Sequence, residues 1–232
     1  SVLEPHLGLG TIQPDDVLTI VFTSVSTGYP KGVVLSIENV GSNVRAISDL
    51  LHLSPADTAL GVLPFFHSYG YTTALWVPLM LEPAVVYHTN PLDAKVVGKL
   101  ARDYHATVLM ATPTFLRTYI RRTEPDDFST LEVVFGAAEK LTTDVTDAFE
   151  EKFGVRPREA YGATELSPLV AANVPPSRHV PGRAIDAREG TVGKPILGCT
   201  AKITEREGVD ELPIGEEGLL WIHGPNVMQG YL

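Results

Sequence analysis

The chain has 232 residues, of which 44% are hydrophobic and 20% are charged, a composition typical of a globular protein with one large domain or two small ones. Its formal net charge of −10 disfavours a nucleic acid as partner, because phosphate backbones bind basic surfaces and no basic run is visible. The single cysteine, Cys199, excludes an internal disulfide framework and any multi-cysteine metal site.

The ends of the chain and its apolar stretches bear on location. Residues 1–13 lack the basic segment and apolar run of a signal peptide, and the longest apolar stretch, residues 74–81, is too short to span a bilayer. We therefore expect a cytoplasmic protein. Because the chain begins without Met and stops at Leu232 within a predicted strand-and-turn region, we also expect it to be a piece of a longer protein.

Short β-rich runs alternate with longer amphipathic runs between residues 17 and 161, which is typical of βαβ units around a mostly parallel sheet. The first run, Val17–Thr23, is nearly continuously apolar and predicts a strand that is buried on both faces. A helix is predicted over 38–51, because apolar residues recur at helical spacing after Ser36, which serves as N-cap.

The same alternation predicts the elements that follow. Further strands are predicted at residues 58–63, 84–87, 107–110, 132–135 and 158–161. Further helices are predicted at residues 70–81, 93–104, 113–122 and 142–153. Thr112 and Pro113 supply the cap and the first-turn proline of the helix over 113–122.

After Glu165 the helical periodicity ends, and prolines and glycines separate short runs such as 200–204 and 219–223. The predicted fold class is α/β: a layered, mostly parallel sheet with flanking helices, plus part of a small antiparallel β-subdomain. We predict three parts, namely an α/β subdomain with a phosphate loop (1–176), a loop-rich connection (177–190) and the start of the β-subdomain (191–232).

The segment Thr23–Gly32 (TSVSTGYPKG) leaves the first predicted strand and combines hydroxyls, glycines and Lys31. Hydroxyls and backbone N–H groups can converge on phosphate oxygens, glycines permit close approach, and the lysine supplies a positive charge. The Walker pattern G-x-x-x-x-G-K-[ST] cannot be placed here. A polar turn with a solvated lysine is the alternative interpretation.

This loop resembles the phosphate-loop signature T-S-G-S-T-G-x-P-K-G of the adenylate-forming (AMP-binding, acyl-CoA synthetase) superfamily. Four further segments match in the family's order: LPFFHSYGYT (63–72), VVFGAAEKL (133–141), YGATELSP (161–168) and GEEGLLWIHGPNVMQGYL (215–232). The resemblance implies a fragment of the large N-terminal domain of such an enzyme. The segments FHSYGYTTALWVPL, GAAEKL and TELSPLVAAN are most similar to the acyl-activating domain of acyl-acyl-carrier-protein synthetases, including the 2-acylglycerophosphoethanolamine acyltransferase fusions. The related long-chain acyl-CoA synthetases remain close.

The resemblance also implies roles for individual residues. The residues implied to hold the β- and γ-phosphates of ATP are Thr23, Ser24, Ser26, Thr27, Gly28 and Lys31. Those implied to flank adenine are Gly136, Ala137, Ala138 and Glu139, with the Tyr161 ring stacked on the base, and the nucleotide-binding residues also include Gly162 and Ala163. Thr164 would contact the α-phosphate and the substrate carboxylate, Glu165 would bind Mg²⁺, and His67 would lie between the acid pocket and the thiol channel.

The activity that the resemblance implies is ATP-dependent activation of a carboxylic acid, a medium- or long-chain fatty acid, to acyl-AMP with release of pyrophosphate. Thioester formation with CoA or the phosphopantetheine of acyl carrier protein would follow. A fused acyltransferase domain would associate the full-length protein with the inner face of the membrane. The family's ribose-binding aspartate and catalytic lysine lie beyond the matched segments, so the chain by itself is expected to be inactive.

Each of these roles has a structural alternative. Glu165 could merely cap a helix, His67 could be a packed turn histidine, and Tyr161 could be strand-end core. We interpret three other aromatic residues of this region as helix packing rather than as acid pocket: Tyr69, Tyr71 and Trp76.

Two positions depart from the family's pattern. Val25 replaces a loop glycine, and Ile37 replaces a common histidine, which leaves open a non-catalytic nucleotide-binding relative. An α/β hydrolase is not supported, because no G-x-S-x-G elbow is present.

Overall fold

The computed structural model describes residues 9–23, 29–178 and 187–232. Seven strands form the main sheet in the order β4–β3–β5–β6–β7–β8–β9. The parallel strands are β3 (Thr58–Gly61), β4 (Ala84–Tyr87), β5 (Val108–Ala111), β6 (Val133–Gly136) and β7 (Arg158–Gly162). The sheet continues in antiparallel pairing through β8 (Leu169–Ala172) and β9 (Lys194–Pro195). The predicted mostly parallel α/β sheet is therefore confirmed.

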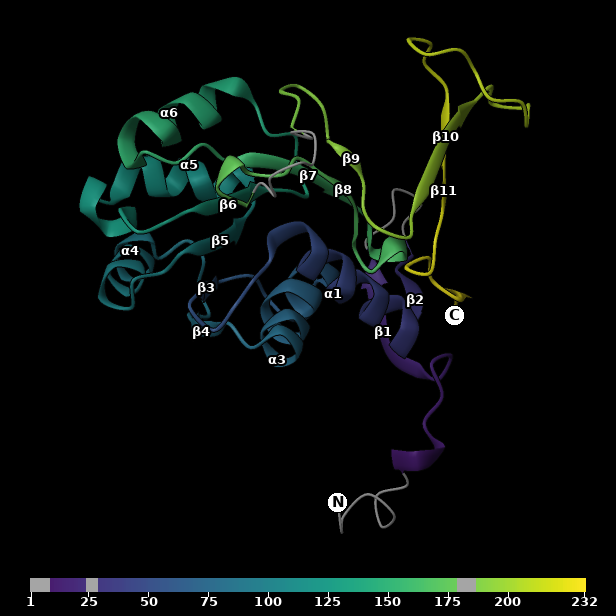
Figure 1. Cartoon of the computed structure of the whole chain (residues 1–232), viewed down its shortest axis with the longest axis horizontal. Coiled ribbons are helices and arrows are strands. Elements are labelled where there is room, and N and C mark those ends of the chain that lie inside the picture. The colour runs from purple at the N-terminus through teal and green to yellow at the C-terminus, as the bar shows by residue number, and fades with distance from the viewer. Residues whose placement is uncertain (1–8, 24–28, 179–186) are drawn as a thin grey trace.

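Helices cover both faces of this sheet (Figure 1). One face packs against α4 (Ala94–Asp103), α5 (Pro113–Arg122) and α6 (Thr143–Phe153). The other packs against α1 (Ile37–Leu51) and a continuous helical run made of α2 (Ser68–Gly70), the π-helical turn η2 (Tyr71–Trp76) and α3 (Val77–Leu81). Because side chains alternate along a strand, Leu109 and Val134 belong to the first core, whereas Val108 and Val133 belong to the second.

Aromatic rings fill the core beneath α4, α5 and α6. Phe128, in the short 3₁₀ helix η3 (Pro125–Phe128), is fully buried, with its ring centroid 5.5 Å from that of Tyr119 and 5.1 Å from that of Phe153. Phe149 joins the same group at 4.6 Å from Phe153. These contacts join η3, α5 and α6 on one face of the sheet, and the site forms on the opposite face.

Capping side chains lie at the predicted starts of α1 and α5. The Ser36 side chain accepts from the backbone N–H of Asn39, and the Asn39 side chain accepts from the backbone N–H of Ser36, which makes a reciprocal cap on α1. The Thr112 hydroxyl accepts from Phe115 N at the start of α5. None of the helices that the structure describes is both long and apolar enough to cross a bilayer.

The first strand departs from its prediction. β1 (Val17–Thr23) does not enter the parallel sheet but pairs antiparallel with β2 (Lys31–Ser36), which also pairs with β12 (Gly230–Tyr231). Within β1 only Val21 is buried, and Phe22 is 65% exposed. The expectation of a strand buried on both faces was wrong, because a continuous apolar run does not reveal how many faces of a strand are covered.

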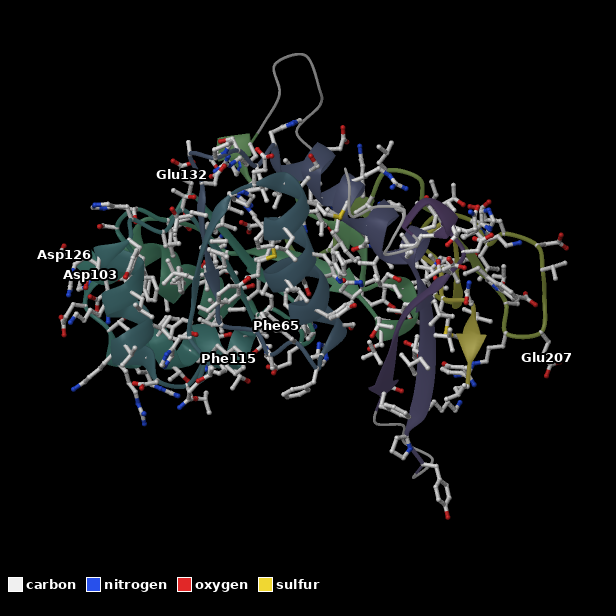
Figure 2. The ribbon with its side chains drawn as sticks, turned by 90° about the horizontal axis from the view of Figure 1, so that it is seen from below. Phe65, Asp103, Phe115, Asp126, Glu132 and Glu207 are labelled. Carbon is white, nitrogen blue, oxygen red and sulfur yellow. The ribbon has the colours of Figure 1, made fainter. Side chains whose placement is uncertain are left out.

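The strands after residue 191 belong to three different sheets. The short runs 200–204 and 219–223 form β10 (Thr200–Thr204) and β11 (Leu219–His223), an antiparallel hairpin that projects from the body (Figure 1). β9 extends the main sheet and β12 extends the β1–β2 sheet. Figure 2 shows Glu207, in the loop of this hairpin, at one end of the molecule, and Asp103 and Asp126 at the other end.

Three short 3₁₀ helices complete the described elements: η1 (Leu9–Thr11), η4 (Thr164–Leu166) and η5 (Pro176–Arg178). The Arg178 guanidinium forms ion pairs with the buried Asp57 carboxylate and with Glu132. These pairs tie the segment after β8 to the loops that precede β3 and β6. They lie at the amino ends of the parallel strands and leave the carboxyl ends for the candidate site.

Candidate active site

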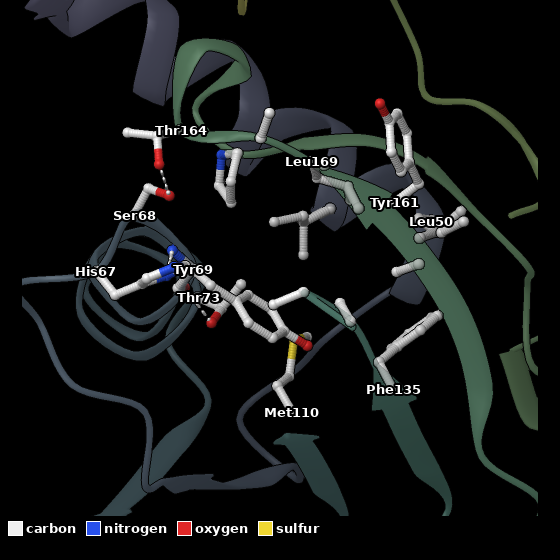
Figure 3. Close-up of a pocket in the computed structure, with 18 of the residues that line it drawn as sticks. Leu50, His67, Ser68, Tyr69, Thr73, Met110, Phe135, Tyr161, Thr164 and Leu169 are labelled. Carbon is white, nitrogen blue, oxygen red and sulfur yellow. Dashed lines mark hydrogen bonds between the residues drawn. The ribbon is translucent and has the colours of Figure 1, made fainter. Parts of the chain in front are cut away.

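A cavity of about 190 Å³ lies at the carboxyl ends of β5, β6 and β7, between the sheet and helices α1 and α2 (Figure 3). In open α/β sheets, ligands bind at this end of the strands. Its apolar wall comes from α1 and the sheet: Ile47, Leu50, Leu51, Met110, Phe135 and Leu169. The remaining wall contains most of the predicted site residues outside the phosphate loop: His67, Ala137, Ala138, Tyr161, Gly162, Ala163 and Thr164.

His67 begins the helical run that closes one side of the cavity. Its Nδ1 accepts a hydrogen bond of 3.1 Å from the backbone N–H of Tyr69, so the helix starts at Ser68, two residues before the predicted start. Burial lowers the pKa of His67, which favours the neutral ring. With Nδ1 accepting, the neutral ring carries its proton on Nε2. His67 is therefore both a helix cap and part of the cavity wall.

Ser68 connects this helix to Thr164 on the other side of the cavity. The Ser68 and Thr164 hydroxyl oxygens are 3.2 Å apart (Figure 3). The Thr72 hydroxyl donates to the Ser167 carbonyl at 2.9 Å, which is a second link between the same two segments. The Thr164 hydroxyl is thus held at the cavity by a helix far from it in sequence.

Glycines make this close approach possible at two points. A Cβ at Gly70 would lie 2.2 Å from the Pro64 carbonyl oxygen, so only glycine lets α2 pack on the turn before it. A Cβ at Gly162 would lie 2.1 Å from the Pro168 carbonyl oxygen, where the chain turns back after β7. Any larger residue at either position would displace the segment that carries His67 or Thr164.

The residues predicted to surround adenine divide between the cavity and its surroundings. Tyr161, 37% exposed, lies across the cavity from the Ser68–Thr164 pair (Figure 3), while Ala138 has a left-handed backbone with φ of 69°. Gly136 ends β6 and does not line the cavity, and the exposed Glu139 carboxylate accepts from the Thr114 hydroxyl at 2.8 Å. The cavity therefore brings together part of the predicted segment.

Lys31 and Glu165 meet outside the cavity through Tyr231, a residue that the sequence interpretation missed. Tyr231 Oη donates a hydrogen bond of 2.8 Å to Glu165 Oε1, and this bond raises the pKa of the tyrosine. Lys31 Nζ lies 4.7 Å from the centroid of the same ring. Thr23, the last residue of β1, is the register partner of Lys31.

Ser24, Val25, Ser26, Thr27 and Gly28 lie outside the described residues. The second departure, Ile37, is the first residue of α1, and its backbone N–H donates to the Asp16 carbonyl oxygen at 3.0 Å. A histidine there would keep that backbone bond.

The three aromatic residues interpreted as helix packing do pack, and one of them, Tyr69, also lines the cavity. Tyr71 and Trp76 do pack edge to face, with ring centroids 6.2 Å apart. Tyr69 belongs to the buried core beside α1 and also lines the cavity, and its hydroxyl is buried without a hydrogen-bond partner among the described residues. Its spacing from His67 does not single it out, because residues two positions apart on a helix face different sides.

Comparison with known proteins gives a consistent result. The AMP-binding enzyme family matches residues 7–232 of the chain. A probable 4-coumarate–CoA ligase 1 of Dictyostelium discoideum is 33% identical over 222 residues, which is 93% of this chain and 38% of that protein. A long-chain-fatty-acid–CoA ligase of Yersinia pestis is 28% identical over 241 residues, covering 100% of this chain and 41% of that protein.

Solved structures share the fold. ATP-bound MatB from Rhodopseudomonas palustris superposes with a TM-score of 0.82 at 29% identity, covering 94% of this chain and 42% of that chain. O-succinylbenzoate coenzyme A synthetase (MenE) from Bacillus subtilis, in complex with ATP and magnesium ion, has a TM-score of 0.80 at 26% identity, covering 95% of this chain and 44% of that chain. The chain thus spans about two-fifths of the length of the curated relatives it matches.

Proposed function

Because the chain belongs to the AMP-binding enzyme family, we propose that the protein containing it joins a carboxylic acid to AMP and then transfers the acyl group to a thiol. The placement of Thr164 and Glu165 supports this most directly. Thr164 lines the cavity, and the next residue, Glu165, reaches Tyr231 beside Lys31. A cavity that would hold the carboxylic acid and the adenine ring thus adjoins charged groups suited to a polyphosphate.

The proposed first step requires positioning more than basicity. A carboxylic acid is ionised at neutral pH, so its oxygen can attack the α-phosphorus of ATP without a general base. A P–O bond forms to the acid while the bond from that phosphorus to pyrophosphate breaks. Because both reactants are anions, Lys31 would neutralise phosphate charge, and the Thr164 hydroxyl would orient the α-phosphate and the carboxylate.

Glu165 is the proposed ligand for Mg²⁺, which when bound supplies charge neutralisation on the polyphosphate. Its bond to Tyr231 engages one carboxylate oxygen and leaves the other for a cation. Nowhere in the described ranges do three or more His, Cys, Asp or Glu side chains gather as a metal site. That fits Mg²⁺, which proteins hold through one or two carboxylates together with substrate phosphates.

The nucleotide base is assigned to the Tyr161 side of the cavity. Stacking on Tyr161 and contact with the segment from Gly136 to Glu139 would hold adenine, while the loop from Thr23 to Lys31 would hold the terminal phosphates. The backbone at Ala138 already takes a left-handed turn beside the cavity, which supports a close approach by a flat ligand.

For the second step, CoA is the proposed acyl acceptor, since the similar proteins are named as CoA ligases. The alternative acceptor, which the sequence resemblance suggests, is the phosphopantetheine of acyl carrier protein. In that case a fused acyltransferase domain would place the protein at the inner face of the membrane. His67, neutral and at the cavity wall, is the residue that the incoming thiol would pass. A cytoplasmic location is part of this proposal.

Two classes of acid are candidates. A medium- or long-chain fatty acid follows from the sequence resemblance and from the name of the Yersinia relative. An aromatic acid follows from the name of the Dictyostelium relative, and the Tyr69 hydroxyl supports it. A buried hydroxyl without a partner is costly, and an acid with a polar substituent would supply that partner.

Acid-dependent exchange between ATP and pyrophosphate in the intact protein tests this proposal. Palmitate, octanoate and 4-hydroxycinnamate would be compared, with Glu165→Gln as the inactive control and Tyr69→Phe as the selectivity variant. Exchange that appears only with acid supports adenylation. A Tyr69→Phe loss confined to 4-hydroxycinnamate selects the aromatic class, whereas ATP binding without exchange on any acid favours the non-catalytic relative.

A further inference from the structure

The side chain of Tyr231 contacts both proposed charge-bearing groups of the phosphate site, Lys31 and Glu165. Its hydroxyl donates to Glu165 Oε1 at 2.8 Å, and its ring lies 4.7 Å from Lys31 Nζ. Lys31 begins β2 and Glu165 lies in η4, so the contact joins two segments that are far apart in sequence. The tyrosine itself comes from a third segment, β12.

The backbone around Tyr231 is fixed to both of these segments. Tyr231 pairs with Val33 in the β12–β2 ladder, and Leu232 N donates to the Gly32 carbonyl oxygen at 2.7 Å. On the other side, Met228 N donates to the backbone carbonyl oxygen of Glu165 at 2.8 Å. The short strand therefore holds the phenol in one place relative to both charged side chains.

We propose, on the basis of the proposed function, that Tyr231 is a positioning residue that orients the Glu165 carboxylate for Mg²⁺ and the Lys31 ammonium for phosphate. Metal-ligating carboxylates are themselves hydrogen-bonded by outer residues that fix their orientation, and loss of such a partner typically lowers metal affinity about 10- to 100-fold. The Tyr231 hydroxyl engages one carboxylate oxygen and leaves the other free to coordinate.

The ring has a separate effect on Lys31. An aromatic face is an uncharged partner for an ammonium group, so the contact orders the lysine without neutralising its charge. A direct Lys31–Glu165 ion pair would instead consume both groups that the nucleotide needs. The hydroxyl and the ring thus act on different charged groups, and two substitutions separate them.

This role differs from simple packing. The Tyr231 side chain is 48% exposed, so its removal takes little apolar surface out of a core. A merely structural contact would therefore change the melting temperature slightly, by the same amount with or without metal. A positioning role changes the metal requirement of nucleotide binding.

The test is calorimetric titration of ATP, without acid, into the intact protein at several Mg²⁺ concentrations and in EDTA. Tyr231→Phe keeps the ring and is expected to weaken MgATP binding about 10-fold or more while leaving metal-free ATP binding unchanged. Tyr231→Leu is expected to weaken both. Tyr104→Phe, at an exposed tyrosine at the end of α4, is the matched control and should change neither.

Two further variants separate this inference from the function on which it rests. If Glu165→Gln and Lys31→Ala leave MgATP binding unchanged, the phosphate site itself is wrongly assigned, and the role of Tyr231 is rejected with it. If those variants weaken binding but Tyr231→Phe keeps the wild-type Mg²⁺ dependence, only the positioning role is overturned. A change of melting temperature alone in Tyr231→Phe would overturn the positioning role in the same way.

Discussion

Asn43 on α1 and Asn226 near β12 together hold the segment that carries Thr164 and Glu165. Asn43 Nδ2 donates to the carbonyl oxygens of Leu166 and Leu169 at 3.3 and 2.8 Å, and its Oδ1 accepts from Leu169 N at 3.2 Å. Asn226 Nδ2 donates to the same two carbonyls at 2.9 and 3.1 Å. Both asparagines are buried.

The loss in the free energy of unfolding on replacing either asparagine by alanine can be estimated, because both side chains donate to the same two carbonyl oxygens. Asn43→Ala leaves Leu169 N without its acceptor, which costs about 1 to 3 kcal/mol, but both carbonyls keep Asn226 as donor. Asn226→Ala leaves both carbonyls with Asn43 but removes the acceptor of the Cys199 thiol, and should cost about 1 kcal/mol. The double variant removes both side-chain donors, so its loss should exceed the sum of the single losses by about 0.5 to 2 kcal/mol.

Urea unfolding of the four proteins, followed by far-ultraviolet circular dichroism, gives the free energies of unfolding for this cycle. Thr130→Ala with Asn226→Ala is the comparison cycle, because the Thr130 hydroxyl donates to the Ala106 carbonyl oxygen at 2.8 Å, at the other end of the sheet. Additivity within about 0.3 kcal/mol for the Asn43–Asn226 pair would refute the idea that they stabilise the same carbonyls.

Substitutions at the site and in the core should have separable effects. Lys31→Ala and Glu165→Ala should each raise the transition-state free energy of acid-dependent ATP–pyrophosphate exchange by about 2 to 4 kcal/mol and so slow the exchange. An unchanged rate would contradict the assigned role. Phe128→Ala should destabilise the fold by about 3 to 5 kcal/mol in thermal unfolding, whereas Phe66→Ala, at an 84% exposed ring, should have little effect; equal losses would contradict the core assignment. Because burial lowers the pKa of His67 below its ordinary value of 6.5, the unfolded chain binds the proton more readily, and stability should fall as the pH drops below about 6.5. His67→Asn keeps a cap acceptor and should flatten that dependence, so a wild-type slope in the variant would exclude this histidine as its source.

Local patterns in the sequence predicted most of the elements correctly. The helix Pro113–Arg122 was predicted with the bounds that it has, because a capping threonine, a first-turn proline and apolar spacing all act within a few residues. The strands of the parallel sheet were predicted for the same reason, since Val133–Gly136 and its neighbours are short apolar runs between turn residues. The family resemblance likewise depends on short contiguous motifs.

Only the tertiary structure decided which segments lie together. The apolar run of β1 looked like a central strand, but its partner is β2, and strand pairing depends on distant residues that no local period encodes. The contacts of Tyr231 with Lys31 and Glu165, and the shared carbonyls of Asn43 and Asn226, likewise join segments that are far apart in the chain. Periodicity reports which face of an element is apolar, whereas the site consists of polar side chains placed by the packing of those faces.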